Sequence, residues 1–177
     1  MSRVELASLN FTEYKLITPL RRDVSKILDA EVRLNEMNLE MEIYYNPERG
    51  QYDASKIITD FENTGPESKT IIFTSMDIYI PIFTYIFGLA KLGGTTAIVS
   101  SYRLKNEFYG LPKNELLLHQ RLLKECFHEL GHLHGLKHCM NYNCVMNSSS
   151  NNEELDTKGY EYCDTCIESV LPGRYQA

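Results

Sequence analysis

The sequence contains no tryptophan, no low-complexity tract and no apolar run long enough to cross a membrane. Its most apolar stretch, from Ile78 to Ala90, is interrupted by Pro81 and falls short of the ~20 residues that a transmembrane helix needs. The amino end lacks the apolar segment of a secretory signal. We therefore expect a soluble, cytoplasmic protein that has no membrane partner.

Positive charge is also scarce. The chain has 18 Lys and Arg residues against 24 Asp and Glu residues, which gives a net charge of -6. It has no basic block and no basic run interleaved with aromatic residues, which are the usual signs of binding to a phosphate backbone. The sequence therefore predicts no nucleic-acid partner.

The chain length of 177 residues suits one domain, because a domain of this size buries roughly 70% of the surface that its unfolded chain exposes. Such a core forms without disulfides, so the five cysteines need another explanation. In a reducing compartment, clustered thiols bind metal more often than they pair.

Strand-like and helical patterns alternate through the first two-thirds of the chain. Thr18 and Pro19 form a favourable N-cap and first-turn pair for a helix that continues to Val32, and Asp53 can cap a second helix. The β-branched run at 70–74 predicts a central strand. Further strands are predicted at 15–18, 39–45, 85–90 and 95–100. This order predicts a mixed, largely parallel sheet with helices packed on it, in the α+β class.

A longer helical pattern follows. Pro112 opens it, leucines recur every seven residues from Leu116 to Leu130, and Gly135 is a natural left-handed stop. Beyond this glycine, residues 139–177 contain few apolar side chains. Because this segment could not bury a core of its own, we expect another interaction to order it.

The end of this predicted helix has the sequence His-Glu-Leu-Gly-His-Leu-His-Gly-Leu-Lys-His, starting at His128. Positions four apart lie on one helix face, so His128 and His132 can present two nitrogens to one ion. Zinc in a catalytic site takes a third protein ligand and keeps one place for water, and Gly135 lets the chain turn so that His138 supplies that ligand. Glu129 is placed to activate the zinc-bound water by taking its proton.

The alternative is that these histidines only line a helix end, where cationic side chains interact favourably with the helix dipole. A bare H-E-x-x-H pattern would leave that alternative substantial weight, because short motifs recur by chance. The longer zinc-site motif also requires a glycine and a third histidine at fixed spacings, and this sequence has both, at Gly135 and His138. The sequence therefore favours a catalytic zinc site.

Four cysteines form a second pattern. Cys139 and Cys144 are separated by four residues, and Cys163 and Cys166 form a C-x-x-C pair. Four thiolates make a closed structural zinc site that contributes to folding, which would explain how the core-poor segment is ordered. A redox-active C-x-x-C pair is the competing interpretation, but it leaves the other two thiols without a role. Cys126 lies on the apolar side of the predicted helix and is expected to be a small buried side chain.

The combined pattern H-E-x-x-H-x-x-G-x-x-H-C-x4-C-x-M, followed by C-x-x-C, resembles the archaemetzincins, a branch of the metzincin zinc peptidases. Fainter resemblance covers most of the chain and includes Arg49, Gln51, Tyr52, the 88–94 stretch, Val99, Ser100, Arg103 and Leu104. The resemblance identifies Met146 with the family's Met-turn, an apolar floor beneath the catalytic histidines. Some metzincins have a tyrosine two residues later, where this chain has Ser148.

The resemblance implies a metzincin-like zincin fold, with a twisted mixed sheet, a backing helix and the active-site helix in residues 1–138. Residues 139–177 would form a small zinc-stabilised C-terminal part of the same catalytic domain, with the cleft between the two parts. In metzincins the substrate adds an antiparallel strand to the sheet's edge. The corresponding segment here is 94–99, with Gly94, Thr95, Thr96 and Ala97 as substrate-binding residues, and an edge strand without a substrate role is an equal alternative.

We expect a monomeric zinc metallopeptidase with a peptide or protein substrate, two zinc ions per chain, and Glu129 as the catalytic residue. The alternative is a zinc-folded peptide-binding or regulatory module with little or no turnover. We expect His134 to face the cleft or solvent and His119 to be an exposed helix residue. Lys137 would meet either a substrate carboxylate or the carbonyl groups at the helix end.

Overall fold

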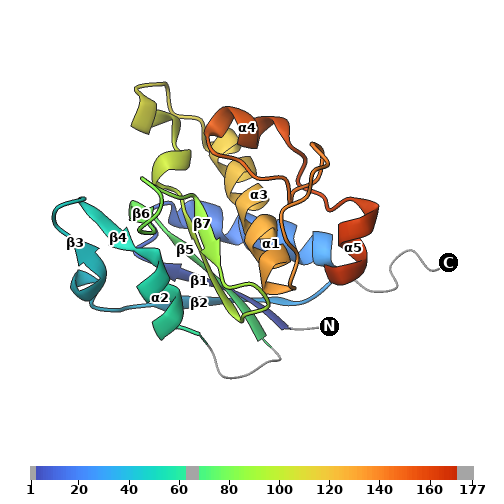
Figure 1. The fold of residues 1–177 in the computed structure, drawn as a ribbon, viewed down its shortest axis with the longest axis horizontal. Helices are drawn as coiled ribbons and strands as arrows, with labels where there is room; N and C mark the ends of the chain where they lie inside the picture. The colour runs from blue at the N-terminus through green and yellow to red at the C-terminus, as the bar shows by residue number, and fades with distance from the viewer. Residues whose placement is uncertain (1–2, 63–67, 171–177) are drawn as a thin grey trace.

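The computed structural model describes residues 3–62 and 68–170 (Figure 1). The strands in these residues are β1 (Arg3–Leu9), β2 (Val32–Met37), β3 (Tyr45–Asn46), β4 (Gln51–Asp53), β5 (Ser68–Thr74), β6 (Ile78–Tyr79), β7 (Gly88–Ala90) and β8 (Thr96–Ser100). The α-helices are α1 (Tyr14–Leu28), α2 (Ala54–Asp60), α3 (Glu115–Leu133), α4 (Asn152–Thr157) and α5 (Asp164–Val170). Three short 3-10 helices are η1 (Glu42–Tyr44), η2 (Tyr102–Leu104) and η3 (Asn106–Tyr109).

The main sheet has five strands in the order β2-β1-β5-β8-β7. Its neighbours pair in parallel except for β7 and β8, which are antiparallel and joined by a turn in which Gly93 has φ +71°. Strand β5 lies in the middle, as its β-branched sequence predicts. A small second sheet has the order β3-β4-β6. These features confirm the predicted mixed, largely parallel sheet.

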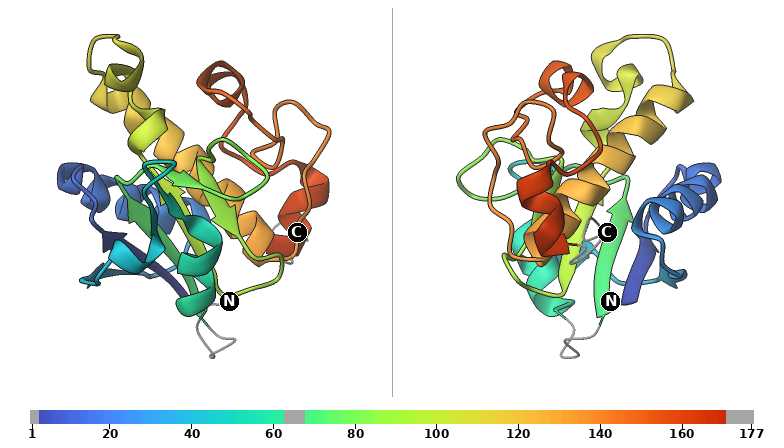
Figure 2. Two further views of the ribbon diagram at one scale, coloured as in Figure 1. Left: turned by 60° about the vertical axis from the view of Figure 1, so that its left-hand side comes forward. Right: turned by 90° about the vertical axis from the view of Figure 1, so that its right-hand side faces the viewer.

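Helices cover both faces of the main sheet, as Figure 2 shows. The side chains of Leu6, Ile71 and Val99 belong to a core shared with α1 and α3. The alternate side chains of Ala7, Ile72 and Ile98 belong to a second core shared with α2. Helix α3 therefore has the sheet on one side, and the C-terminal segment packs on its other side.

Helix α1 differs from the prediction at both ends. The predicted strand at 15–18 lies inside the helix, although the predicted inward side chains of Leu20, Val24 and Leu28 are buried. The chain leaves the helix at Asp29, which has φ +51°, so Val32 begins β2 instead of extending the helix. The strand prediction was wrong because the four-residue spacing of the inward side chains, which is helical, already starts at Leu16. Leu16 packs against the same core as Leu20, Val24 and Leu28.

The predicted strand at 39–45 is also wrong. Met41 and Tyr44 are buried three residues apart, so the chain turns there as η1, and only Tyr45–Asn46 extends as β3. The Asp53 cap is confirmed, because its carboxylate accepts hydrogen bonds from the amides of Ser55 and Lys56.

Strand β8 corrects the prediction for the substrate segment. All its residues are buried, and it pairs with β5 on one side and β7 on the other. The segment 94–99 is therefore not an edge strand, and the paired backbone at Thr96 and Ala97 cannot accept an added strand. Strand β7 is the edge of the sheet on this side.

Helix α3 begins after Asn114, whose side chain accepts a hydrogen bond from the Leu117 amide, and the chain turns at Gly135 with φ +84°. The segment that follows packs on this helix, and its buried side chains, Val145, Met146, Leu155, Ile167 and Val170, join the core that α1 and α3 form. The core-poor segment thus shares the main core. Residues 171–177 of the predicted C-terminal part lie outside the described residues. None of the helices in the described chain is long and apolar enough to span a membrane.

Candidate active site and metal centres

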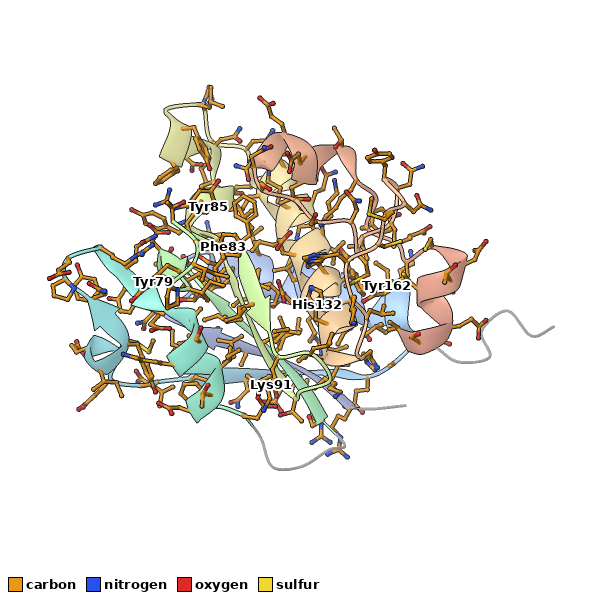
Figure 3. All side chains as sticks on the ribbon, in the orientation of Figure 1. Tyr79, Phe83, Tyr85, Lys91, His132 and Tyr162 are labelled. Atoms are coloured by element: carbon orange, nitrogen blue, oxygen red, sulfur yellow. The ribbon has the colours of Figure 1, made fainter. Side chains whose placement is uncertain are left out.

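Three histidines meet at the carboxyl end of α3. His128 and His132 lie one turn apart on the helix, and His138 returns to them from the loop after Gly135 (Figure 3 labels His132). One ligand atom from each ring lies within 4.8 Å of those of the other two. The left-handed backbone at Gly135, which glycine adopts without strain, makes this return possible.

The hydrogen bonds of two of the rings leave their Nε2 atoms facing each other. His128 Nδ1 donates to the Val145 carbonyl at 2.8 Å, and His132 Nδ1 donates to the Leu136 carbonyl at 2.7 Å. The two Nε2 atoms then lack protons and lie 3.1 Å apart. Two nitrogens that bind one tetrahedral zinc at about 2.0–2.1 Å lie about 3.3 Å apart. The rings therefore fit a zinc ion, and the carbonyl contacts fix the tautomer that binds it.

Burial lowers the pKa of His128 well below its usual value, and it also lowers the pKa of His132 and His138. The nearby Lys158 ammonium lowers all three pKa values further. The neutral form that this favours near pH 7 is the form of imidazole that binds metal.

Glu129 follows His128 and lines the same cleft. It is buried, and its Oε2 atom has no hydrogen-bond partner among the described residues. Its Oε1 would lie only 2.6 Å from a Cβ placed on Gly88 of β7, so glycine at that position makes room for the carboxyl group. Burial, reinforced by Glu125, raises the pKa of Glu129 well above its usual value. A buried carboxyl group with an unpaired oxygen beside the metal-binding nitrogens can exchange a proton with water there.

A cleft of about 630 Å³ contains this site. Its floor is formed by side chains of α3, namely Glu125, His128, Glu129 and His132. One wall is the mainly apolar segment 83–90 with Ile80 and Leu92, and the other contains Ser148–Ser150. The Tyr85 hydroxyl donates to the Ser150 carbonyl at 3.0 Å, so the two walls touch at this point (Tyr85 is labelled in Figure 3).

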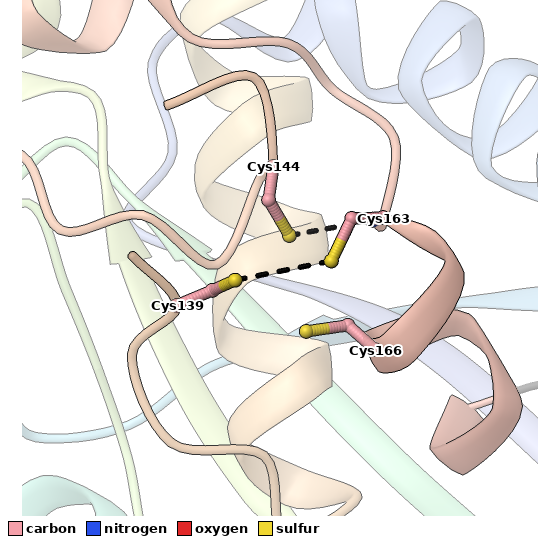
Figure 4. A group of neighbouring side chains, drawn as sticks. All are labelled: Cys139, Cys144, Cys163 and Cys166. Atoms are coloured by element: carbon pink, nitrogen blue, oxygen red, sulfur yellow. Dashed lines mark hydrogen bonds between the residues drawn. The ribbon is translucent and has the colours of Figure 1, made fainter. Parts of the chain in front are cut away.

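The four predicted cysteines form a second cluster, shown in Figure 4. The sulfur atoms of Cys139, Cys144, Cys163 and Cys166 all lie within 4.8 Å of one another, and none forms a disulfide. The Cys139 and Cys163 sulfurs are 3.8 Å apart. Sulfurs bound to one tetrahedral zinc at about 2.3 Å lie about 3.8 Å apart, whereas a disulfide requires about 2.05 Å. The cluster therefore fits a closed zinc site better than a redox pair.

Backbone contacts connect the two clusters. His138 and Cys139 are consecutive, and the Cys139 amide donates to the Met146 carbonyl at 2.9 Å. Met146 is fully buried, and its sulfur leaves no room for a Cβ on Gly131 of α3. The turn at Met146 therefore packs directly against the helix that carries the first two histidines.

The family model described as peptidase family M54 matches residues 14–171. This chain belongs to peptidase family M54. An M54 relative, the archaemetzincin of Methanocaldococcus jannaschii, is 39% identical over 133 residues, which cover 75% of this chain and 73% of the relative. The archaemetzincin of Haloarcula marismortui is 36% identical over 148 residues, which cover 82% of this chain and 86% of the relative.

Solved structures agree with the M54 assignment. A zinc-dependent peptidase from Methanocorpusculum labreanum has a TM-score of 0.82 and 30% identity, with 94% of this chain and 99% of that chain covered. An archaemetzincin from Archaeoglobus fulgidus has a TM-score of 0.81 and 31% identity, with 95% and 99% covered. The predicted archaemetzincin family, fold and metallopeptidase class are confirmed. The alternative of a binding module without turnover is not favoured.

Four other residues of this M54 chain for which the sequence made predictions lie outside the two clusters. His134 is half-buried and lies outside the three-histidine group, whereas Lys137 lines the cleft. Cys126 is fully buried, as predicted, and burial raises its pKa. The prediction for His119 is wrong, because its ring packs between helices and its Nε2 contacts the Asp23 carboxylate of α1 at 2.8 Å.

The predicted substrate segment lies away from the cleft of this M54 chain. None of Gly94, Thr95, Thr96 and Ala97 lines the cleft, and the Thr95 amide instead donates to Glu62 at 2.9 Å. The sequence prediction missed two buried charged residues near the site, Glu125 and Lys158. Only Glu125 had a signal, since it lies four positions before Glu129 and therefore on the same helix face.

Proposed function

We propose that this chain hydrolyses peptide bonds with one zinc ion held by His128, His132 and His138 and with Glu129 as the catalytic base. The observation that carries the proposal is the unpaired Oε2 of Glu129 beside two unprotonated Nε2 atoms at a separation that suits zinc. Zinc bound there would lower the pKa of a water molecule to near 7 and polarise the scissile carbonyl.

Glu129 would move the protons of the reaction. Its carboxylate would accept a proton from the attacking water and return it to the amine of the departing peptide. Its burial among the side chains of α3 and β7 keeps this group at a fixed distance from the histidines and away from bulk water.

Strand β7 is the best candidate for holding the substrate. It pairs only with β8 among the described strands, so its other edge can pair with an extended peptide. Because Gly88 is adjacent to the Glu129 carboxyl group, a peptide added at this edge would pass the catalytic base. Substrate contacts would then lie at Gly88, Leu89 and Ala90 instead of at 94–97.

A second zinc ion at the four cysteines completes the proposal, with two ions per chain. It would fix the segment after His138 around Met146, which would serve as the Met-turn floor of the histidine site. Residues 1–138 and 139–177 would then be two parts of one catalytic domain, in keeping with their shared core. The monomeric state, the cytoplasmic location and the absence of nucleic-acid and membrane partners stay predictions from the sequence.

The replacement Glu129→Gln tests the catalytic role. We expect the turnover of a peptide library to fall by about 100-fold or more, because proton transfer contributes factors of about 10² to 10⁴. Zinc content, measured by mass under native conditions, should not change. Glu168→Gln, an exposed carboxylate of α5, is the matched control. Equal peptide cleavage by Glu129→Gln and its parent would contradict the mechanism.

A further inference from the structure

A buried lysine lies between α3 and the turn at Met146. Lys158 is 3% exposed and directly follows α4. Its ammonium donates a hydrogen bond to the Asn147 carbonyl at 2.9 Å and lies 3.8 Å from Glu125 Oε1. Across 3–62 and 68–170, the ammonium has no other hydrogen-bond or ion-pair partner.

The two partners of Lys158 belong to different sides of the histidine site. Glu125 lies on α3 one turn before Glu129, and its side chain lines the cleft. Asn147 follows Met146, and its side-chain amide donates to the Cys139 carbonyl at 2.8 Å, next to His138. One ammonium therefore bridges the helix that carries two histidines and the turn that supports the third.

Two neighbouring cations already attach α3 to the segment around α4. Lys124 donates to the carbonyls of Leu155 and Asp156, both at 2.9 Å, and Arg121 forms a bidentate pair with the Asp156 carboxylate. Within the described residues, neither forms a hydrogen bond or an ion pair with the turn at Met146. Attachment of α4 to α3 thus has its own contacts, and Lys158 reaches a different target.

We propose that Lys158 is a positioning residue, which holds His138 opposite His128 and His132 by tying Glu125 to the turn at Asn147. The Lys158 ammonium is excluded from water. Its interactions with Glu125 and Asn147 are therefore stronger than they would be in water and restrict the movement of the turn. The catalytic consequence rests on the function proposed above, whereas the consequence for metal retention at the three histidines does not. If Lys158 only balanced the charge of Glu125, its replacement would not affect metal retention in a variant that also lacks the Glu125 charge.

The test compares Lys158→Met, the double variant Lys158→Met with Glu125→Gln, and the control Lys124→Met. Each is loaded with Co²⁺, whose bands at the histidines differ from the thiolate charge-transfer bands at the cysteines, and is then mixed with a chelator. Lys158→Met alone should have a lower Tm, because it leaves the buried Glu125 charge unpaired. The double variant should recover most of that Tm, because neither charge remains.

We expect the double variant to lose Co²⁺ from the histidine site roughly 10- to 100-fold faster than the parent, on the scale by which loss of outer partners weakens metal affinity. Its kcat should fall by a similar factor with little change in KM. Lys124→Met should release Co²⁺ at the parental rate even if its Tm falls. Parental Co²⁺ release in the double variant would overturn the proposal and leave Lys158 as a counter-ion for Glu125.

Glu125→Gln alone keeps the test decisive if the Lys158 variants do not fold, because it removes the ion pair to α3 while the ammonium keeps its bond to the Asn147 carbonyl. It should release Co²⁺ faster than the parent, and parental release would again overturn the proposal. If the parent cleaves no peptide, the proposed peptidase function fails, whereas the Co²⁺ release rates still decide the role of Lys158.

Discussion

Gly88 is the residue at which the sheet edge meets the proposed catalytic base. A Cβ at this position would lie 2.6 Å from Glu129 Oε1 and 2.9 Å from its Cγ, closer than side-chain atoms approach in practice. Glu129 is 4% exposed, so its carboxyl group has little space into which it can withdraw. The identity of residue 88 therefore controls where the base sits relative to the histidines.

The first prediction concerns Gly88→Ala. Displacement of the carboxyl group should lower kcat by about 100-fold, since a shift of about 1 Å in a reacting group has effects of this size. Overpacking should lower the free energy of unfolding by about 1–3 kcal/mol. Peptide kinetics and urea unfolding would measure the two effects, with Ala7→Gly of β1, which does not line the cleft, as a control for a change between glycine and alanine in the sheet. A variant with parental kcat would show that the base has room to move.

Residue spacing sufficed to predict the histidine cluster, because it depends on local chain geometry. One helical turn separates His128 from His132, and the glycine turn returns His138. For the cysteines, spacing indicated the two pairs, and tertiary packing brings the pairs together. Lys158 could not be predicted in this way. Its partner Glu125 lies on α3, and only tertiary packing brings the two side chains together and removes them from water.

Helix α1 is attached to the carboxyl ends of two strands through one side chain. The Glu13 carboxylate accepts hydrogen bonds from Ser75 after β5 and from Ser101 after β8, and it pairs with Lys105. Burial alone would raise the pKa of Glu13, but the bonds from Lys105, Ser101 and Ser75 outweigh burial and lower it. These contacts anchor the start of the helix at a position that local propensity does not reveal.

The second prediction is that Glu13→Gln lowers the free energy of unfolding by about 1–3 kcal/mol at neutral pH. Because the pKa of Glu13 is lower in the folded chain, its stabilising contribution is complete above the usual value of 4.5 and is lost as pH falls through the folded-state value. The difference between parent and variant should therefore shrink in acid. Urea unfolding at neutral pH and below pH 4.5 would measure it, and a difference that does not depend on pH would contradict the assignment.

Elements with a distinctive run or repeat of apolar residues were predicted well, and others were not. Strand β5 was recognised from its β-branched residues, and α3 from its leucines. Strand β1 is covered on both faces, as β5 is, but it lacks the run of β-branched residues that marked β5, so the sequence did not reveal it. The segment 39–45 alternates in sequence, yet it turns so that Met41 and Tyr44 can reach the same core.

At the scale of the whole molecule, two clusters of candidate metal ligands adjoin through the consecutive residues His138 and Cys139, and the chain from His138 onward contributes to both. The buried side chains of this C-terminal segment join the main core. The sequence prediction did not anticipate this, because only a small part of the segment is apolar. Packing therefore helps to order the segment, and a metal at the four thiolates would add to this order. Loss of the thiolates should then have different effects from loss of the three histidines.

The third prediction compares Cys163→Ser and Cys166→Ser with His138→Ala. The cysteine variants should bind one zinc fewer than the parent's expected two and should unfold about 10 °C lower or more, because a structural zinc contributes directly to folding. His138→Ala should also lose one zinc, together with peptide cleavage, but should keep its C-terminal segment folded. Native mass and thermal unfolding would measure these outcomes, and an unchanged Tm in both cysteine variants would rule out a structural ion.

The single peptide bond between His138 and Cys139 has a consequence for how the protein matures. A metal held by the four thiolates would fix Cys139 in space and thereby confine the adjacent imidazole to a small volume near the other two rings. The third histidine would then act at a high effective concentration, so the second metal would bind faster and more tightly after the first. Filling of the two sites would be coupled, and a nascent chain would hold its histidine-bound ion more tightly once its cysteines had been metallated.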